Sequence, residues 1–110
     1  MGFQHKELGQ GRWFRLSFLE QMGNIGSEVE RFLNWRAKNN SAYSDQAFER
    51  ALELIDLTME DPKNSKRLKE PARARETIAD HCLGNKEFAG TDEALRKYFS
   101  FFAYAARKGR

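Results

Sequence analysis

The segment 44–60 constrains the fold of this sequence more than any other, because its apolar residues recur at the spacing of an α-helix. The apolar face is formed by Phe48, Leu52, Ile55 and Met59. Acidic residues collect on the opposite face, at Glu49, Glu53, Asp56 and Glu60. We therefore predict an amphipathic helix here, with Ser44 as its N-cap, and we expect every other segment to pack against it.

Three further segments show helical periodicity, namely 12–38, 65–83 and 91–108. Gly23 and Gly26 interrupt the first of them, and Ser27 with Glu30 forms a capping box at which a second helix could begin. The apolar seam keeps its phase across both glycines, which favours one continuous helix.

Prolines and capping residues predict where the helices end. Pro62 ends the helix over 44–60, because proline disfavours helical geometry at the residue before it. Pro71 either begins the third helix as its first residue or kinks an earlier turn, and Thr91 is the expected cap of the last helix. Four helices with short connections predict an all-α fold, an antiparallel up-down four-helix bundle. This single domain spans 12–110, after a flexible lead over 1–11.

The composition is that of a globular chain of 110 residues, with 40% apolar and 32% charged residues. Cys82 is the only cysteine, which excludes an intramolecular disulfide and favours a reducing compartment. No apolar run approaches the ~20 residues that a membrane span needs, and the N-terminus shows no secretory signal. We therefore expect a cytoplasmic protein that does not associate with membranes.

Positive charge is predicted to gather at one end of the bundle, where the starts of the first and third helices meet the ends of the second and fourth. We call this set the basic pole, and its members are Arg12, Arg15, Lys63, Lys66, Arg67, Lys69, Arg73, Arg107 and Lys108. Cations at the start of a helix oppose the helix dipole, and a bound phosphate would explain them. The alternative is an ordinary solvated surface on a chain of net charge +3.

The third helix carries a charge within its predicted apolar stripe. That stripe consists of Leu68, Ala72, Ala79 and Cys82. Arg75 lies among them and needs a partner, for which Glu30 and Asp56 are the candidates, unless it faces a ligand in a cavity. Arg75 and His81 also resemble, in their spacing alone, the catalytic pair of HEPN-type helical ribonucleases. Their side chains lie about 120° apart around one helix, so they need a helix break or a second subunit to share a phosphate.

Other chemistry is not indicated by the sequence. It contains no nucleophilic triad, no glycine-rich phosphate loop and no dinucleotide fingerprint. Asp80, His81 and Cys82 are consecutive and point to different sides of a helix, so they do not form a metal site. We therefore expect no metal and no cofactor, and we favour a protein that is not an enzyme.

Several large apolar residues lie off the predicted core faces. These candidate interface residues are Trp13, Trp35, Leu57, Phe101 and Tyr104. Exposed groups of this kind often form an interface, so we expect a homodimer or another protein partner. The alternative is that the N-terminal lead and the loop 84–90 cover them.

Three parts of the chain resemble an uncharacterised family of small bacterial all-helical proteins. They are the string NIGSEV at 24–29, the segment from ALEL to DPKN at 51–64, and the segment from YF to AYAAR at 98–107. The resemblance covers roughly 14–107 and implies a bacterial, all-helical single domain. It brings no catalytic residues.

Two functional hypotheses follow from the sequence. The first is a non-enzymatic helical module that self-associates or binds a protein partner through its aromatic faces. The second is a bundle that binds RNA or phosphate through the basic pole, with a HEPN-like ribonuclease as its catalytic form. Phosphate binding weakens steeply with salt, whereas an apolar interface persists, so salt dependence separates the two.

Overall fold

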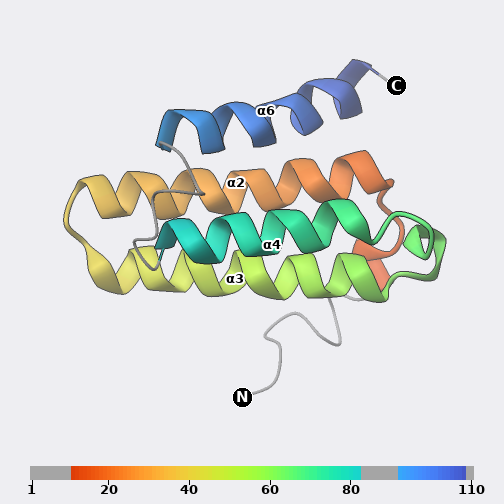
Figure 1. Ribbon diagram of the computed structural model, residues 1–110, viewed down its shortest axis with the longest axis horizontal. Helices are drawn as coiled ribbons and strands as arrows, with labels where there is room; N and C mark the ends of the chain where they lie inside the picture. Colours follow the sequence, from red (N-terminus) through yellow and green to blue (C-terminus); the bar gives the residue numbers. More distant parts are fainter. Residues whose placement is uncertain (1–10, 83–91, 109–110) are drawn as a thin grey trace.

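The computed structural model describes residues 11–82 and 92–108 and shows an all-α bundle. Its elements are α2 (Phe18–Ala37), α3 (Ser41–Glu60), the short 3-10 helix η1 (Pro62–Asn64), α4 (Lys69–Cys82) and α6 (Asp92–Lys108). Figure 1 shows α2 and α4 running in one direction and α3 and α6 in the other. The predicted all-α, antiparallel up-down bundle is therefore confirmed. Residues 1–10 of the predicted lead over 1–11, the loop 84–90 and the cap at Thr91 lie outside the described residues, whereas Gly11 is described and is helical.

The bundle is organised around α2 rather than around the segment 44–60. Helix α2 packs along α3 on one side and along α6 on the other, while α4 packs mainly on α3 (Figure 1). The buried apolar residues of α2 are Met22, Ile25, Val29, Phe32 and Leu33. The prediction that every other segment packs against 44–60 is therefore wrong, since α6 rests mainly on α2.

Helix α2 begins at Phe18, later than predicted, because Ser17 caps its N-terminal end. Residues 11–13 form a helical turn, and the chain then turns before α2 starts. The Ser17 hydroxyl accepts a hydrogen bond from the Glu20 amide (3.1 Å), and the Glu20 carboxylate accepts one from the Ser17 amide (2.9 Å). This reciprocal capping box satisfies two amides that a helix start leaves unpaired. The prediction of one helix over 12–38 is therefore wrong at its N-terminal end.

The two glycines of α2 do not break it, as predicted, and they let α6 approach. A Cβ atom at Gly26 would lie 2.7 Å from the Cβ of Phe99, and one at Gly23 would lie 3.3 Å from the Cα of Ala103. Only a residue without a side chain allows the backbones of α2 and α6 to come so close.

Helix α3 begins at Ser41 rather than at Ser44. Its N-cap is Asn40, whose side-chain oxygen accepts a hydrogen bond from the Tyr43 amide (3.1 Å). Ser44 lies inside the helix, where its buried hydroxyl donates to the Phe32 carbonyl of α2 (3.3 Å). The predicted end of the helix before Pro62 is confirmed.

Helix α4 starts at Lys69, so Pro71 sits in its first turn, where the missing amide removes no helical hydrogen bond. The buried face of α4 consists of Pro71, Ala74, Ile78 and His81. The predicted stripe is therefore wrong: Leu68 is exposed, Ala72 and Ala79 are only half-buried, and the Cys82 side chain is not described. Both stripes follow helical spacing, and the contacts with α3 select the one that is buried.

Candidate functional site

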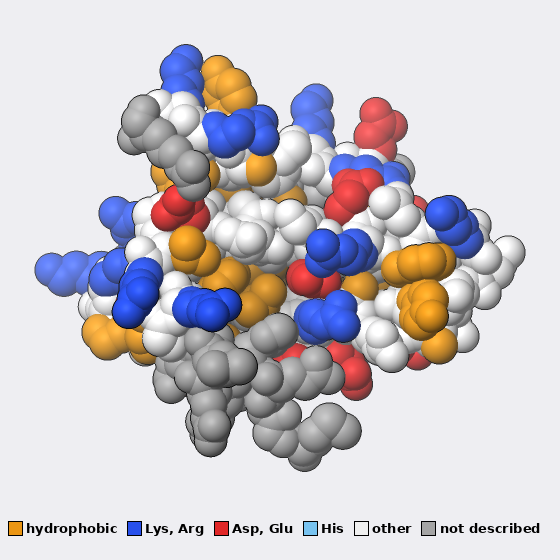
Figure 2. All heavy atoms as spheres, turned by 180° about the vertical axis from the view of Figure 1, so that it is seen from behind, with side chains coloured by type: hydrophobic (Ala, Val, Ile, Leu, Met, Phe, Trp, Pro, Cys, Tyr) orange, Lys and Arg blue, Asp and Glu red, His pale blue; other side chains and the backbone are white. Residues whose placement is uncertain are grey.

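The elements that carry the basic pole meet at one end of the bundle. The start of α2, the helix η1, the start of α4 and the end of α6 lie there together (Figure 1), and Lys and Arg side chains gather at the left end of Figure 2. Lys63 forms an ion pair with Asp61 and also donates to the Phe14 carbonyl (2.9 Å). Within residues 11–82 and 92–108, no salt bridge involves another member of the pole.

Beneath this pole lies a buried polar network centred on Gln21. The Gln21 amide group donates to the Trp13 carbonyl (2.9 Å) and to the Asp61 carboxylate (2.8 Å), and it accepts from the Asn64 side chain (2.8 Å). Asn64 donates in addition to the Thr58 carbonyl (2.9 Å). The network joins the segment before α2 to the end of α3 and to η1. It has the hydrogen bonds that buried polar groups require, and its position indicates a structural role.

Opposing effects act on the pKa of the Asp61 carboxyl group. Burial raises this pKa, but hydrogen bonds from Lys63 and Gln21, together with the charge of Lys63, outweigh burial and hold it below its ordinary value. Asp61 therefore stays ionised at neutral pH and stabilises the turn that follows α3.

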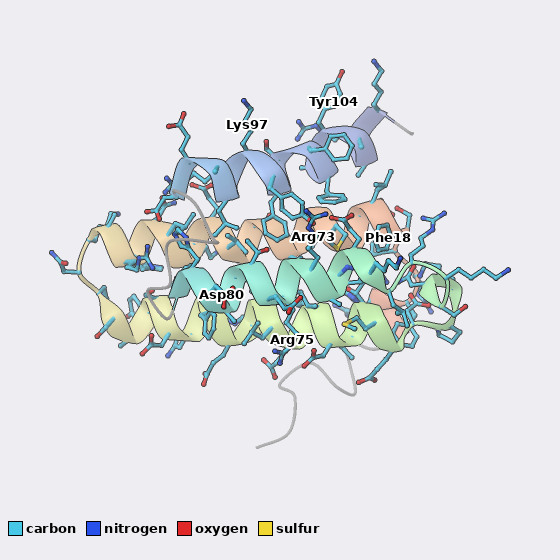
Figure 3. All side chains as sticks on the ribbon, in the orientation of Figure 1. Phe18, Arg73, Arg75, Asp80, Lys97 and Tyr104 are labelled. Carbon is cyan, nitrogen blue, oxygen red and sulfur yellow. The ribbon has the colours of Figure 1, made fainter. Side chains whose placement is uncertain are left out.

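The two residues of the nuclease-like pattern have different partners in the structure. Arg75 donates from Nε to Asp56 of α3 (3.0 Å), which is one of the two predicted partners. Both side chains are partly exposed, and Figure 3 shows Arg75 next to α3. His81, by contrast, is only 1% exposed and contacts Arg36 and Asp92. The structure therefore does not bring Arg75 and His81 together around one phosphate.

His81 belongs to a cluster that sequence reasoning missed. Its Nε2 atom lies 2.5 Å from Oδ1 of Asp92, and Arg36 donates to the same oxygen (3.0 Å) and to the His81 carbonyl (3.3 Å). A carboxylate only accepts hydrogen bonds, so the contact with Asp92 requires the proton on Nε2, and the Arg36 nitrogen that lies 3.2 Å from Nε2 then makes no hydrogen bond to it. The buried Nδ1 atom has no hydrogen-bond partner among the described residues.

This cluster ties together three helix ends at the pole opposite to the basic one. Arg36 and His81 lie in the last turns of α2 and α4, and Asp92 is the first residue of α6, so the charges of Arg36 and Asp92 suit the dipoles of their helices. Burial raises the pKa of Asp92, but the hydrogen bond from His81 and the charges of Arg36 and His81 lower it more, and the net shift is downward. In the sequence, the only feature that indicated this cluster was the position of the three residues at predicted helix ends.

The predicted interface residues separate into two groups. Trp13 is 7% exposed and donates from its indole nitrogen to the Thr58 hydroxyl (2.9 Å), and Leu57 is fully buried. Their prediction as exposed interface residues is wrong, because Trp13 packs on α3 at Thr58 and Leu57 belongs to the buried core. Trp35 is half-buried and packs edge-on against Tyr43, with 4.8 Å between ring centroids.

The other two predicted interface residues lie on the outer face of α6. Phe101 is 61% exposed and Tyr104 is 55% exposed, whereas Leu95, Phe99 and Phe102 of the same helix are buried. Figure 3 shows Tyr104 and Lys97 pointing away from the other helices. The outer face of α6 is thus an apolar surface flanked by cations, distinct from the face that packs on α2.

The described part of the chain offers no metal-ligand cluster, since no group of three or more His, Cys, Asp or Glu side chains could hold an ion there. Within the same residues, no helix is long and apolar enough to cross a membrane.

The resemblance to a bacterial family stays a prediction. Comparison of the chain with models of known protein families, with curated proteins and with solved structures finds no match.

Proposed function

We propose that this protein is a non-enzymatic helical module that self-associates through the outer face of α6. The observation that carries this proposal is the pair of exposed aromatic side chains at Phe101 and Tyr104, the two most exposed large hydrophobic residues among those described. One face of α6 carries Lys97, Phe101, Tyr104 and Lys108, in this order, at steps of four, three and four residues. Helices pack against one another with this spacing.

Charge along α6 favours a second copy of the chain as the partner. The first turn of α6 holds Asp92 and Glu93, and its last turn holds Arg107 and Lys108. Two α6 helices packed in opposite directions would place the acidic start of each beside the basic end of the other. A two-fold axis near the middle of the helix, next to Phe101, generates such a pair from identical subunits.

In this arrangement, Lys97 lies beside Tyr104 of the second copy and Glu93 beside Lys108 of the second copy. A cation near an aromatic ring contributes about 0.5–1 kcal/mol at an exposed site. One helix pair buries less area than a stable interface of standard size, so we expect dimerisation to be weak and to depend on concentration.

Sedimentation velocity over a range of protein concentrations tests this proposal. Replacing Phe101 and Tyr104 together by Ser should leave a monomer at concentrations at which the wild type is a dimer. Replacing Tyr43 and Leu68 by Ser is the matched control, because it removes two exposed apolar side chains from other surfaces and should leave the dimer intact.

A charge swap tests the antiparallel orientation. Glu93→Lys should weaken the dimer, and adding Lys108→Glu to that variant should restore it. A wild type that remains monomeric at every concentration contradicts the proposal, as does a dimer that the aromatic substitutions leave unchanged. We also propose that the protein is cytoplasmic, because a chain with a single cysteine cannot form an intramolecular disulfide and suits a reducing compartment.

A second candidate function is binding of RNA or another phosphate-bearing partner at the basic pole. It is supported by the lack of acidic partners for most of the pole within the described residues. Replacing Lys66, Arg67 and Lys69 together by Glu should remove retention on immobilised RNA without unfolding the protein, and unchanged retention contradicts this candidate. The ribonuclease form of this candidate predicts that His81→Ala abolishes RNA cleavage. The burial of His81 gives that form no support.

A further inference from the structure

A pocket of about 420 Å³ lies between α2, α3 and the segment that precedes α2. Its apolar wall is formed by Trp13, Leu16 and Leu54, and its charged wall by Arg12, Glu28 and Arg31. The volume falls within the range of small-molecule sites, which combine apolar walls with a few polar groups that fix the orientation of the ligand. None of these residues belongs to the outer face of α6.

The charged wall carries an excess of positive charge. Glu28 accepts a hydrogen bond from Arg31 (2.7 Å) and lies 3.7 Å from a guanidinium nitrogen of Arg50, so one carboxylate faces two cations. Arg12 is the second arginine that lines the pocket, beside Arg31. The Glu28 carboxylate repels an anion, but the two arginines that line the pocket outnumber it, and Glu28 fixes the position of Arg31. The net charge of the wall favours an anionic ligand.

The apolar wall is held rigidly before any ligand binds. The Trp13 indole nitrogen donates to Thr58, and the Trp13 carbonyl accepts from Gln21, each at 2.9 Å. Both partners are buried, so the ring cannot turn without breaking a buried hydrogen bond. A preformed wall lowers the entropic cost of binding.

We propose that this pocket binds a small organic anion with an aromatic or aliphatic body. The body packs on Leu16, Leu54 and the Trp13 ring, and the acidic group faces the guanidinium groups of Arg12 and Arg31. Guanidinium groups bind carboxylate, sulfonate and phosphate oxygens by charge-assisted hydrogen bonds, and the apolar wall requires more than an inorganic ion.

The test uses anilinonaphthalene sulfonate, an aromatic monoanion whose fluorescence rises in apolar sites. We expect saturable one-to-one binding to the full chain. Arg31→Glu should weaken it at least about tenfold, because a hydrogen bond to a charged group is lost. Lys97→Glu makes the same charge change on α6 and should leave the affinity unchanged, as should Phe101→Ser. Circular dichroism verifies that each variant is folded.

Two further measurements locate the site and identify the role of charge. The chain has two tryptophans, and binding should shift the indole N–H resonance of Trp13 but not that of Trp35, with Trp35→Phe assigning the two signals. Neutral phenylnaphthylamine, which lacks the sulfonate, should bind at least tenfold more weakly. The proposal is overturned if the neutral probe binds equally well, if Lys97→Glu and Arg31→Glu have the same effect, or if the Trp35 resonance moves instead.

Discussion

The substitution Asp61→Asn tests whether the network beneath the basic pole stabilises the fold. One carboxylate oxygen of Asp61 accepts from the Lys63 amide (3.1 Å), and the other accepts from Gln21 (2.8 Å) and from the Lys63 ammonium group. An asparagine has only one accepting oxygen. Whichever way its amide is turned, its NH₂ group faces a donor, either the Lys63 amide or Gln21.

Gln21 cannot relieve this conflict by turning its own amide. Such a turn would break its hydrogen bonds to the Trp13 carbonyl and from Asn64. The variant therefore loses one buried hydrogen bond to a charged group and leaves a donor unpaired, which together cost about 3 kcal/mol. The Lys63 side chain is partly exposed, so the lost ion pair adds little.

Urea denaturation followed by circular dichroism measures this loss as a decrease in the free energy of unfolding. Asp56→Asn is the matched control, because Asp56 forms its ion pair with Arg75 at a partly exposed position and should cost no more than about 1 kcal/mol. The reasoning is refuted if the two variants lose the same amount of stability, which would show that the Gln21 network contributes no more than a surface ion pair.

Three other predictions concern stability. Gly26→Ala should destabilise the fold by about 1 kcal/mol, and more than Gly23→Ala does, because the clash with Phe99 exceeds the gain in helix propensity; urea midpoints of the two variants compare them directly. Ser17→Ala removes the hydroxyl that accepts from the Glu20 amide and should lower the free energy of unfolding by about 1 kcal/mol, seen as a lower melting temperature, whereas an unchanged melting temperature would show that the cap is dispensable. The pKa of Asp61 is lower in the folded chain than its ordinary 3.8, so the unfolded chain binds more protons near and below that pH and stability should fall on acidification through this range. Urea midpoints at a series of pH values should show a smaller fall for Asp61→Asn than for the wild type.

Helix ends show what sequence reasoning can and cannot recover. The end of α3 follows from Pro62, because proline restricts the residue before it wherever the chain goes. The sequence also contains the signal for the start of α2, because Ser17 is followed three residues later by Glu20, the pattern of a capping box. The apolar seam, however, favoured a longer helix. Two local signals disagreed there, and the cap prevailed.

The buried faces were harder to predict where a helix has few apolar residues. Helix α4 offers two stripes at helical spacing, and the structure buries the one that ends in His81. Burying a histidine is acceptable only because Asp92 and Arg36 contact it, and these partners lie 11 and 45 positions away along the chain. Leu57 was likewise placed off the core face of α3, because helical spacing within one segment does not show that contacts with the rest of the bundle bury it.

The sequence by itself determined the class of the fold, the direction of each helix relative to its neighbours and the end of the bundle at which Lys and Arg gather. These features depend on periodicity, caps and short connections, which act between residues a few positions apart. Only the tertiary structure decided the central position of α2, the burial of Trp13 and the cluster of Arg36, His81 and Asp92. Those features depend on contacts between distant segments, whose energies are set by how the helices pack together.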